Sequence, residues 1–174
     1  MRTSVALLAG AGLASAQFTS PHNGVYTFAV TSGPEELLGW NLVSAPRAVI
    51  DQDSDAGFVN LVPPDSAPAT EYSFYCPGSA YYIYCQMTGV VDDVSYGVYP
   101  FNGPVGLRRW WAGNAVMYGF YDDGGVLRYN GDFHSEPWVA CPLGDGNYQV
   151  AFYEYDTPTP ADCKAVVLGA TRLS

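Results

Sequence analysis

Residues that could carry out hydrolytic chemistry are few in this 174-residue chain. A nucleophile needs an adjacent base, most often histidine, and the histidines are His22 and His134. His134 lies in the polar segment Asp132–Glu136, where a solvated loop histidine is the ordinary interpretation. The carboxylate pairs Asp92–Asp93 and Asp122–Asp123 are more typical of turns than of a glycosidase acid and base. We therefore expect no catalytic residues and no enzyme activity, and we keep an unrecognised hydrolase as an alternative.

Calcium is the metal for which the sequence offers a candidate site. Asp51, Asp53 and Asp55 have the carboxylate spacing that begins an EF-hand loop, but Val62 stands where a bidentate glutamate belongs. The alternative is an Asp-rich turn stabilised by hydrogen bonds from side chains to the backbone. Zinc needs several closely spaced His or Cys ligands, and this pattern is missing. We expect no metal and no cofactor, with these three aspartates as a weak calcium candidate.

A ligand platform is suggested by four consecutive residues, Arg108, Arg109, Trp110 and Trp111. In a strand, neighbouring side chains point to opposite faces. One tryptophan would then face solvent, with an arginine two residues before it on the same face. Exposed aromatic rings offer apolar area on which sugar faces stack. The alternative is that both tryptophans are buried and the arginines pair with some of the 17 acidic residues.

The N-terminus has the order of a secretory signal peptide. Arg2 supplies the positive charge, Val5–Leu13 is the apolar run, and Ala14–Ala16 supplies the small residues of the cleavage site. The apolar run is shorter than the roughly 18–20 residues that a membrane span needs. We expect cleavage after Ala16 and one secreted domain over residues 17–174, located outside the cell or in a cell wall.

In a secreted chain, an even number of cysteines predicts disulfides. The four cysteines are Cys76, Cys85, Cys141 and Cys163. Neighbourhood along the chain favours Cys76–Cys85, across a Pro-Gly turn, and Cys141–Cys163. Two other connectivities remain open from the sequence alone.

The charge balance narrows the range of partners. Seventeen acidic residues against seven basic ones give a formal net charge of −10. Phosphate binding needs a basic patch, so nucleic acid is not an expected partner, and anionic membranes are disfavoured for the same reason. We expect a monomer whose partners are a cell-wall polysaccharide or an extracellular protein.

Short β-like runs alternate with turn signals along the chain. The runs lie at residues 25–30, 57–62, 72–76, 81–85, 94–99, 115–121, 126–129, 147–153 and 165–170. Residues 63–70 form a proline-rich loop, Asp122–Gly125 is a hairpin signal, and the helix candidate at 34–38 is at most a turn or two. This spacing predicts an all-β single domain of about 11–13 short strands, either a β-trefoil-like barrel or a β-sandwich.

The last third of the chain resembles the PhiA-like secreted proteins of filamentous ascomycetes. The matching motifs are Gly125–Tyr129, Trp138–Pro142, Asn147–Val150 and Asp162–Cys163, with Cys76 and Cys85 fitting the first cysteine pair of the family. The resemblance implies a fungal cell-wall or extracellular protein linked to conidium-bearing cells, with relatives noted as allergens or candidate effectors. It implies no catalytic residues.

Three hypotheses for function follow from the residues and the resemblance together. The first is a secreted structural protein associated with the cell wall. The second is a secreted, effector-like module that binds a glycan or a host protein. The third is the unrecognised hydrolase.

Overall fold

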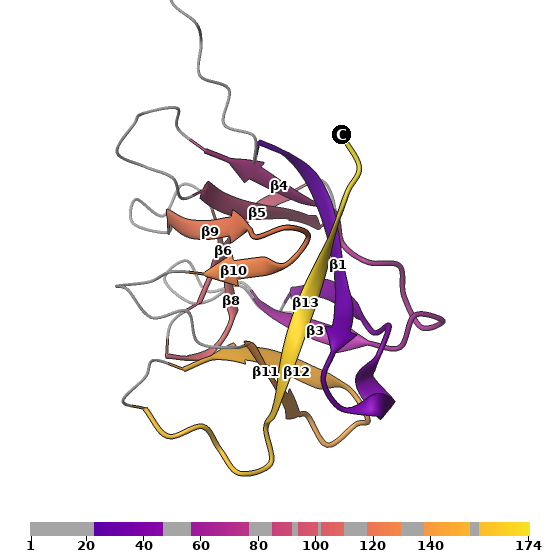
Figure 1. The fold of residues 1–174 in the computed structure, drawn as a ribbon. Helices are drawn as coiled ribbons and strands as arrows, with labels where there is room; N and C mark the ends of the chain where they lie inside the picture. The colour runs from indigo at the N-terminus through magenta and orange to yellow at the C-terminus, as the bar shows by residue number, and fades with distance from the viewer. Residues whose placement is uncertain are drawn as a thin grey trace, which may run out of the picture.

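The computed structural model describes residues 23–46, 57–76, 85–91, 94–100, 102–109, 118–129, 138–153 and 157–174. In these ranges the chain forms thirteen strands and one short 3-10 helix, which confirms the all-β prediction (Figure 1). The elements are β1 (Gly24–Ser32), η1 (Glu35–Leu37), β2 (Asn41–Pro46), β3 (Gly57–Val62), β4 (Tyr72–Tyr75), β5 (Cys85–Val91), β6 (Val94–Tyr99), β7 (Gly103–Pro104), β8 (Gly106–Arg109), β9 (Tyr118–Asp122), β10 (Leu127–Tyr129), β11 (Trp138–Pro142), β12 (Tyr148–Phe152) and β13 (Lys164–Arg172).

Nine of these strands close into an antiparallel barrel. Hydrogen-bonded neighbours follow the order β1, β4, β5, β6, β8, β3, β12, β11 and β13, and β13 pairs back with β1. The two longest strands, β1 and β13, lie side by side along the front of the molecule (Figure 1). The sequence was compatible with either a barrel or a sandwich, and the closed ring of strand pairings shows that the fold is a barrel.

Ring closure depends on strands that change partners along their length. β3 pairs with β8 at Gly57 and Phe58, and with β12 at Asn60 and Leu61. Between these two contacts, the amide of Val59 donates to Val105, whose own amide donates to Val150 on β12. The segment from β7 to β8 therefore bridges β12 and β3 next to the residues where these two strands pair directly.

Aromatic rings fill the interior of the barrel. Phe120, on β9, is fully buried and contacts the rings of Phe74, Tyr129 and Trp138, with centroids 6.4, 5.0 and 6.4 Å away. From Phe74 the contacts continue to Tyr26 and to the other rings of β1 and β4. Much of the aromatic content of the sequence is therefore packed as core.

Both expected disulfides are present. Cys76–Cys85 joins the end of β4 to the start of β5, and both of its cysteines are buried. Cys141–Cys163 joins β11 to the residue before β13, with Cα atoms 4.2 Å apart. Each bridge restricts the unfolded chain and is expected to contribute about 2–4 kcal/mol to stability.

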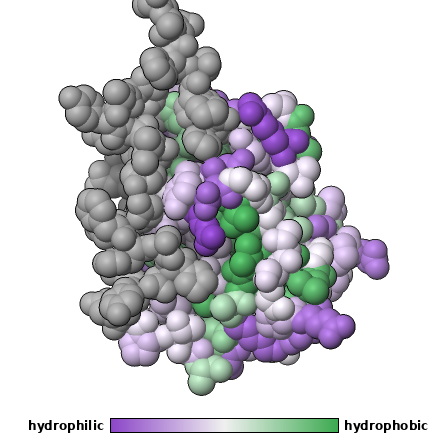
Figure 2. All heavy atoms as spheres, viewed as in Figure 1, coloured by the Kyte–Doolittle hydropathy of each residue, from purple (hydrophilic) through white to green (hydrophobic). Residues whose placement is uncertain are grey.

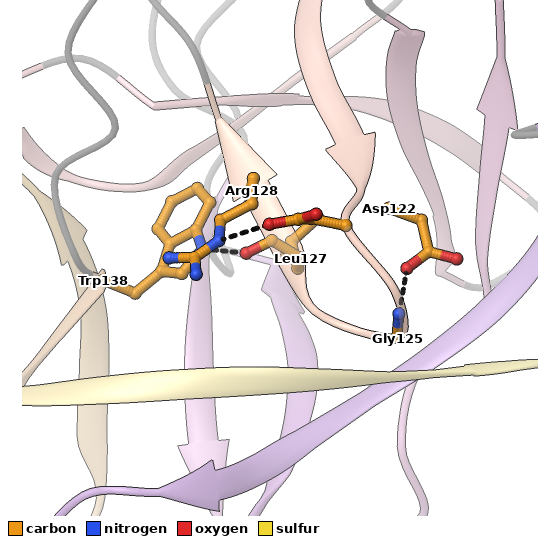
Figure 3. Close-up of polar contacts among 6 residues, drawn as sticks. Asp122, Gly125, Leu127, Arg128 and Trp138 are labelled. Atoms are coloured by element: carbon orange, nitrogen blue, oxygen red, sulfur yellow. Dashed lines mark hydrogen bonds and ion pairs between the residues drawn. The ribbon is translucent and has the colours of Figure 1, made fainter.

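The hairpin predicted at Asp122–Gly125 is confirmed between β9 and β10. Figure 3 shows its polar contacts. The Asp122 carboxylate accepts a hydrogen bond from the Gly125 amide at 2.7 Å, and Asp123 pairs with Arg128 at 3.6 Å. The indole of Trp138 donates to the Leu127 carbonyl at 2.9 Å, which ties the hairpin to β11. These two aspartates therefore serve the turn, as the sequence predicted.

β7 and β11 were not among the predicted runs, and two further strands differ from the sequence-based expectation for reasons that the structure shows. β2 was not predicted, because polar residues interrupt its pattern, but Ser44 donates a hydrogen bond to the Tyr72 hydroxyl at 3.1 Å. β5 runs from Cys85 to Val91, beyond the run expected at 81–85, of which 81–84 lie outside the described residues. Gly89 weakens the strand signal in this segment. Glycine fits the packing there, because a Cβ at this position would lie only 2.8 Å from Ser44 Oγ.

We expect Phe120→Ala to lower the free energy of unfolding by about 3–5 kcal/mol, because it leaves a cavity among packed rings. Urea denaturation measures the loss. The matched control is Leu38→Ala, at a side chain that is 47% exposed, for which a change within about 0.5 kcal/mol is expected. Equal losses in the two variants would contradict a core that depends on Phe120.

Candidate ligand-binding site

The ligand platform predicted from the sequence, Arg108–Trp111, is only half covered by the described residues, which end at Arg109 in this part of the chain. Arg108 and Arg109 lie in β8, where their backbones pair with Gly97 and Tyr96 of β6, so these two residues have the strand conformation that the platform requires. Trp110 and Trp111 lie outside the described residues. Ligand binding at this platform stays a prediction.

Other residues singled out in the sequence also lie outside the described ranges. They are the signal segment 1–16, the aspartates Asp51, Asp53 and Asp55, the pair Asp92–Asp93, and the histidines His22 and His134. Within the ranges that are described, no group of three or more His, Cys, Asp or Glu residues is placed to hold a metal ion. The calcium candidate stays a prediction.

A different set of side chains gathers at the end of the barrel where β1 ends and β13 begins. We call this set the Trp40 corner, and it consists of Trp40, Tyr148, Lys164 and Glu36. The rings of Trp40 and Tyr148 meet nearly at right angles, with centroids 5.6 Å apart and an interplanar angle of 81°. The Lys164 ammonium lies 5.9 Å from the centre of the Tyr148 ring and pairs with the Glu36 carboxylate.

The loop between β1 and β2 positions Trp40 and Glu36. Leu37 of η1 is fully buried and anchors the loop to the core. Gly39 has φ +79°, a left-handed conformation that favours glycine and turns the chain back. The Trp40 amide then donates to the Leu37 carbonyl, and the Trp40 carbonyl accepts from Val30 of β1. Trp40 is thereby held at the barrel end, partly buried against the core.

Two strands bring Tyr148 and Lys164 to the same place. Tyr148 begins β12, opposite Leu61 of β3, and is partly buried against the core. Lys164 begins β13 on the same face as the buried Val166, because alternate residues of a strand share a face. The Cys141–Cys163 disulfide ends one residue before the lysine and fixes its backbone to β11.

The charged members of the corner face solvent. The side chains of Lys164 and Glu36 are 40% and 54% exposed. The hydrogen bond from Lys164 is the main cause that lowers the pKa of Glu36, and the same bond raises the pKa of Lys164. In Figure 2, strongly hydrophilic and hydrophobic side chains lie next to one another at the lower right, where Figure 1 draws the loop that contains η1.

This arrangement has the chemistry of a sugar-binding surface. Two aromatic rings supply apolar faces, and Trp and Tyr also carry a polar tip. Beside them, a carboxylate accepts hydrogen bonds and an ammonium donates them. A few placed polar groups beside aromatic side chains are typical of small-ligand sites.

Sequence reasoning missed this corner. Lys164 is the only lysine in the chain, and Trp40 follows a Gly-containing turn, so both residues carried a signal. Their partners, however, lie 108 to 128 residues away along the chain (148 − 40 and 164 − 36). The pairing of β12 with β3 and of β13 with β1 brings them together.

Comparisons with protein-family models, curated proteins and solved structures find no match to this chain. Among the residues that the structure describes, no helix is long and apolar enough to cross a bilayer. Two disulfides are typical of proteins that fold in an oxidising, extracellular environment.

We expect the Glu36 carboxyl group to titrate below its ordinary pKa of 4.5. A lowered folded-state pKa means that the stabilising contribution is present above the unfolded-state pKa and is lost as the pH falls through the folded-state pKa. In Lys164→Met the Glu36 pKa should rise toward 4.5, which carboxyl-carbon NMR measures.

The matched control for this titration is Arg128→Met, which removes a cation paired with Asp123 on the hairpin. This variant should leave the Glu36 pKa where it is in the unmodified protein. An unchanged Glu36 pKa in Lys164→Met would contradict the ion pair.

Proposed function

We propose that this chain is a secreted, extracellular protein that associates with cell-wall polysaccharide through the Trp40 corner. One observation carries the proposal: two aromatic rings stand at right angles at the barrel end, beside a solvent-facing carboxylate and ammonium. The role is structural and non-catalytic, in that the protein adheres to the wall.

The extracellular location is supported by features other than the corner itself. The first sixteen residues have the order of a signal peptide, and two disulfides staple the barrel. The resemblance of the last third of the chain to PhiA-like proteins supports a fungal cell wall as the specific place. The net charge of −10 suits a soluble extracellular protein.

The charges of the corner favour a neutral sugar surface. Glu36 and Lys164 already neutralise each other, so a ligand does not need to supply a compensating charge. Their exposed polar atoms remain available to sugar hydroxyls, while the rings offer faces for the C–H side of a sugar.

A polymer suits a site of this size. One corner covers few sugar units, so we expect each contact to be weak. A polysaccharide repeats its units along the chain and across a wall, so that a protein released from one unit meets the next at high local concentration. Weak, repeated contacts therefore suffice for retention in a wall.

The test is retention of the purified protein on insoluble β-glucan and on chitin. We expect Trp40→Ala and Tyr148→Ala to lose most of the retention, because each substitution removes one of the two aromatic rings of the corner. Glu36→Ala, at an exposed side chain, should weaken retention with little change in stability. Urea denaturation of each variant separates lost binding from lost folding.

Tyr75→Ala is the matched control, because it removes an exposed aromatic ring from another part of the barrel. It should be retained like the unmodified protein. No retention of the unmodified protein on either polymer would overturn the proposal. Full retention of Trp40→Ala with loss in Trp110→Ala or Trp111→Ala would move the site to the platform predicted from the sequence.

A further inference from the structure

Tyr75 is the most exposed tyrosine whose side chain the structure describes. Its side chain and backbone together are 58% exposed. The others are buried (Tyr26, Tyr72, Tyr96 and Tyr129) or half-buried (Tyr99, Tyr121, Tyr148 and Tyr153). Its phenol group is therefore open to reagents in solution, whereas the core phenols are not.

The fold holds Tyr75 on a rigid part of the barrel wall. In β4, Tyr72 and Phe74 point into the core, while Ser73 and Tyr75 point outward. Both edges of β4 are paired, with β1 on one side and β5 on the other. The next residue, Cys76, is in a disulfide with Cys85. The ring thus stands on a strand that is anchored on both sides and at its end.

On its β5 side Tyr75 has no charged neighbours, whereas on the β1 side the Arg172 guanidinium donates a hydrogen bond to the Asn23 carbonyl, next to the Gly24–Phe74 pair. The whole segment Tyr72–Val91, which includes β4 and β5, has no charged residue. On the neighbouring strand, Thr88 lies opposite Ser73 and Val90 is exposed. The nearest acidic residue along β4 is Glu71, four residues away and roughly 13 Å distant at the rise of a strand. A second phenol therefore meets no acidic side chain of β4 or β5 next to Tyr75, although the whole chain is strongly acidic.

We propose that Tyr75 is a site of oxidative phenol coupling, which links this protein covalently to a tyrosine of a neighbouring protein. The inference rests on the proposed extracellular location, where peroxide and secreted peroxidases are the oxidant and catalyst. Each of the two phenols loses one electron and one proton. These reduce one hydrogen peroxide to two water molecules. The two phenoxyl radicals join through a carbon–carbon bond ortho to the hydroxyl groups, and the rings regain aromaticity by moving the ortho protons to oxygen.

The coupling adds permanence to a weak association. Contacts at the Trp40 corner are reversible, and a carbon–carbon bond between two tyrosines is not. Tyr75 lies on β4, whereas the corner is formed by the loop after β1 and by the starts of β12 and β13. The two sites therefore use different elements of the barrel, and each can be removed without the other.

The test treats the full secreted chain with a haem peroxidase and hydrogen peroxide at physiological salt. Salt is needed because two copies of this strongly acidic chain repel each other, and about 0.15 M salt screens this repulsion beyond roughly 8 Å. We expect dityrosine fluorescence and a covalent dimer on denaturing gels. Mass spectrometry of the digested dimer should find Tyr75 in the cross-linked peptide.

In Tyr75→Phe, which keeps the ring and removes the hydroxyl, we expect loss of most of the dimer. Tyr153→Phe, at a half-buried tyrosine, is the matched control and should couple like the unmodified protein. An undiminished dimer in Tyr75→Phe would overturn the proposal, and so would absence of dimer under conditions that couple free tyrosine. The reaction contains no polysaccharide, so its failure is distinguishable from failure of retention on β-glucan or chitin.

Discussion

A closed ring of nine strands encloses an interior that packed side chains must fill. In this protein much of the buried core is aromatic, and Phe120 of β9 contacts three of the buried rings. On one side its contacts lead to the rings of β1 and β4, and on the other to Trp138 of β11. Because the same rings belong to strands from both halves of the chain, the packing of this core joins the two halves of the barrel.

The two surface sites depend on that core through different elements. Tyr148 and Lys164 are placed by strands whose other residues, such as Val150 and Val166, are buried. Trp40 is placed by Leu37, which is buried beneath the loop. Tyr75 points outward because Phe74 points inward. In each case the backbone of the exposed residue takes its position from a buried neighbour.

The fold class could be predicted from local patterns, since a strand with one buried face shows alternation and a tight turn shows Asp and Gly. β3 and β6 begin and end where the sequence predicts, and the hairpin at Asp122–Gly125 is where its glycines indicate. β2 was not predicted because the polar Ser44 interrupts its pattern. The Ser44 hydroxyl is accommodated by a hydrogen bond to Tyr72, and only the fold brings these two residues together. The cysteine pairing followed from neighbourhood along the chain, because each bridge joins segments that are close in sequence.

By itself, the sequence determined that the chain is all-β, rich in aromatic core residues, acidic, and stapled by two disulfides, because these properties are composition or short-range pattern. It also has the order of an exported chain. The tertiary structure decided that the strands close into a barrel, that Glu36, Trp40, Tyr148 and Lys164 share one end of it, and that Tyr75 faces solvent. The physical reason is range: strand pairing across more than a hundred residues depends on the fit of the whole core, and no local pattern records that fit.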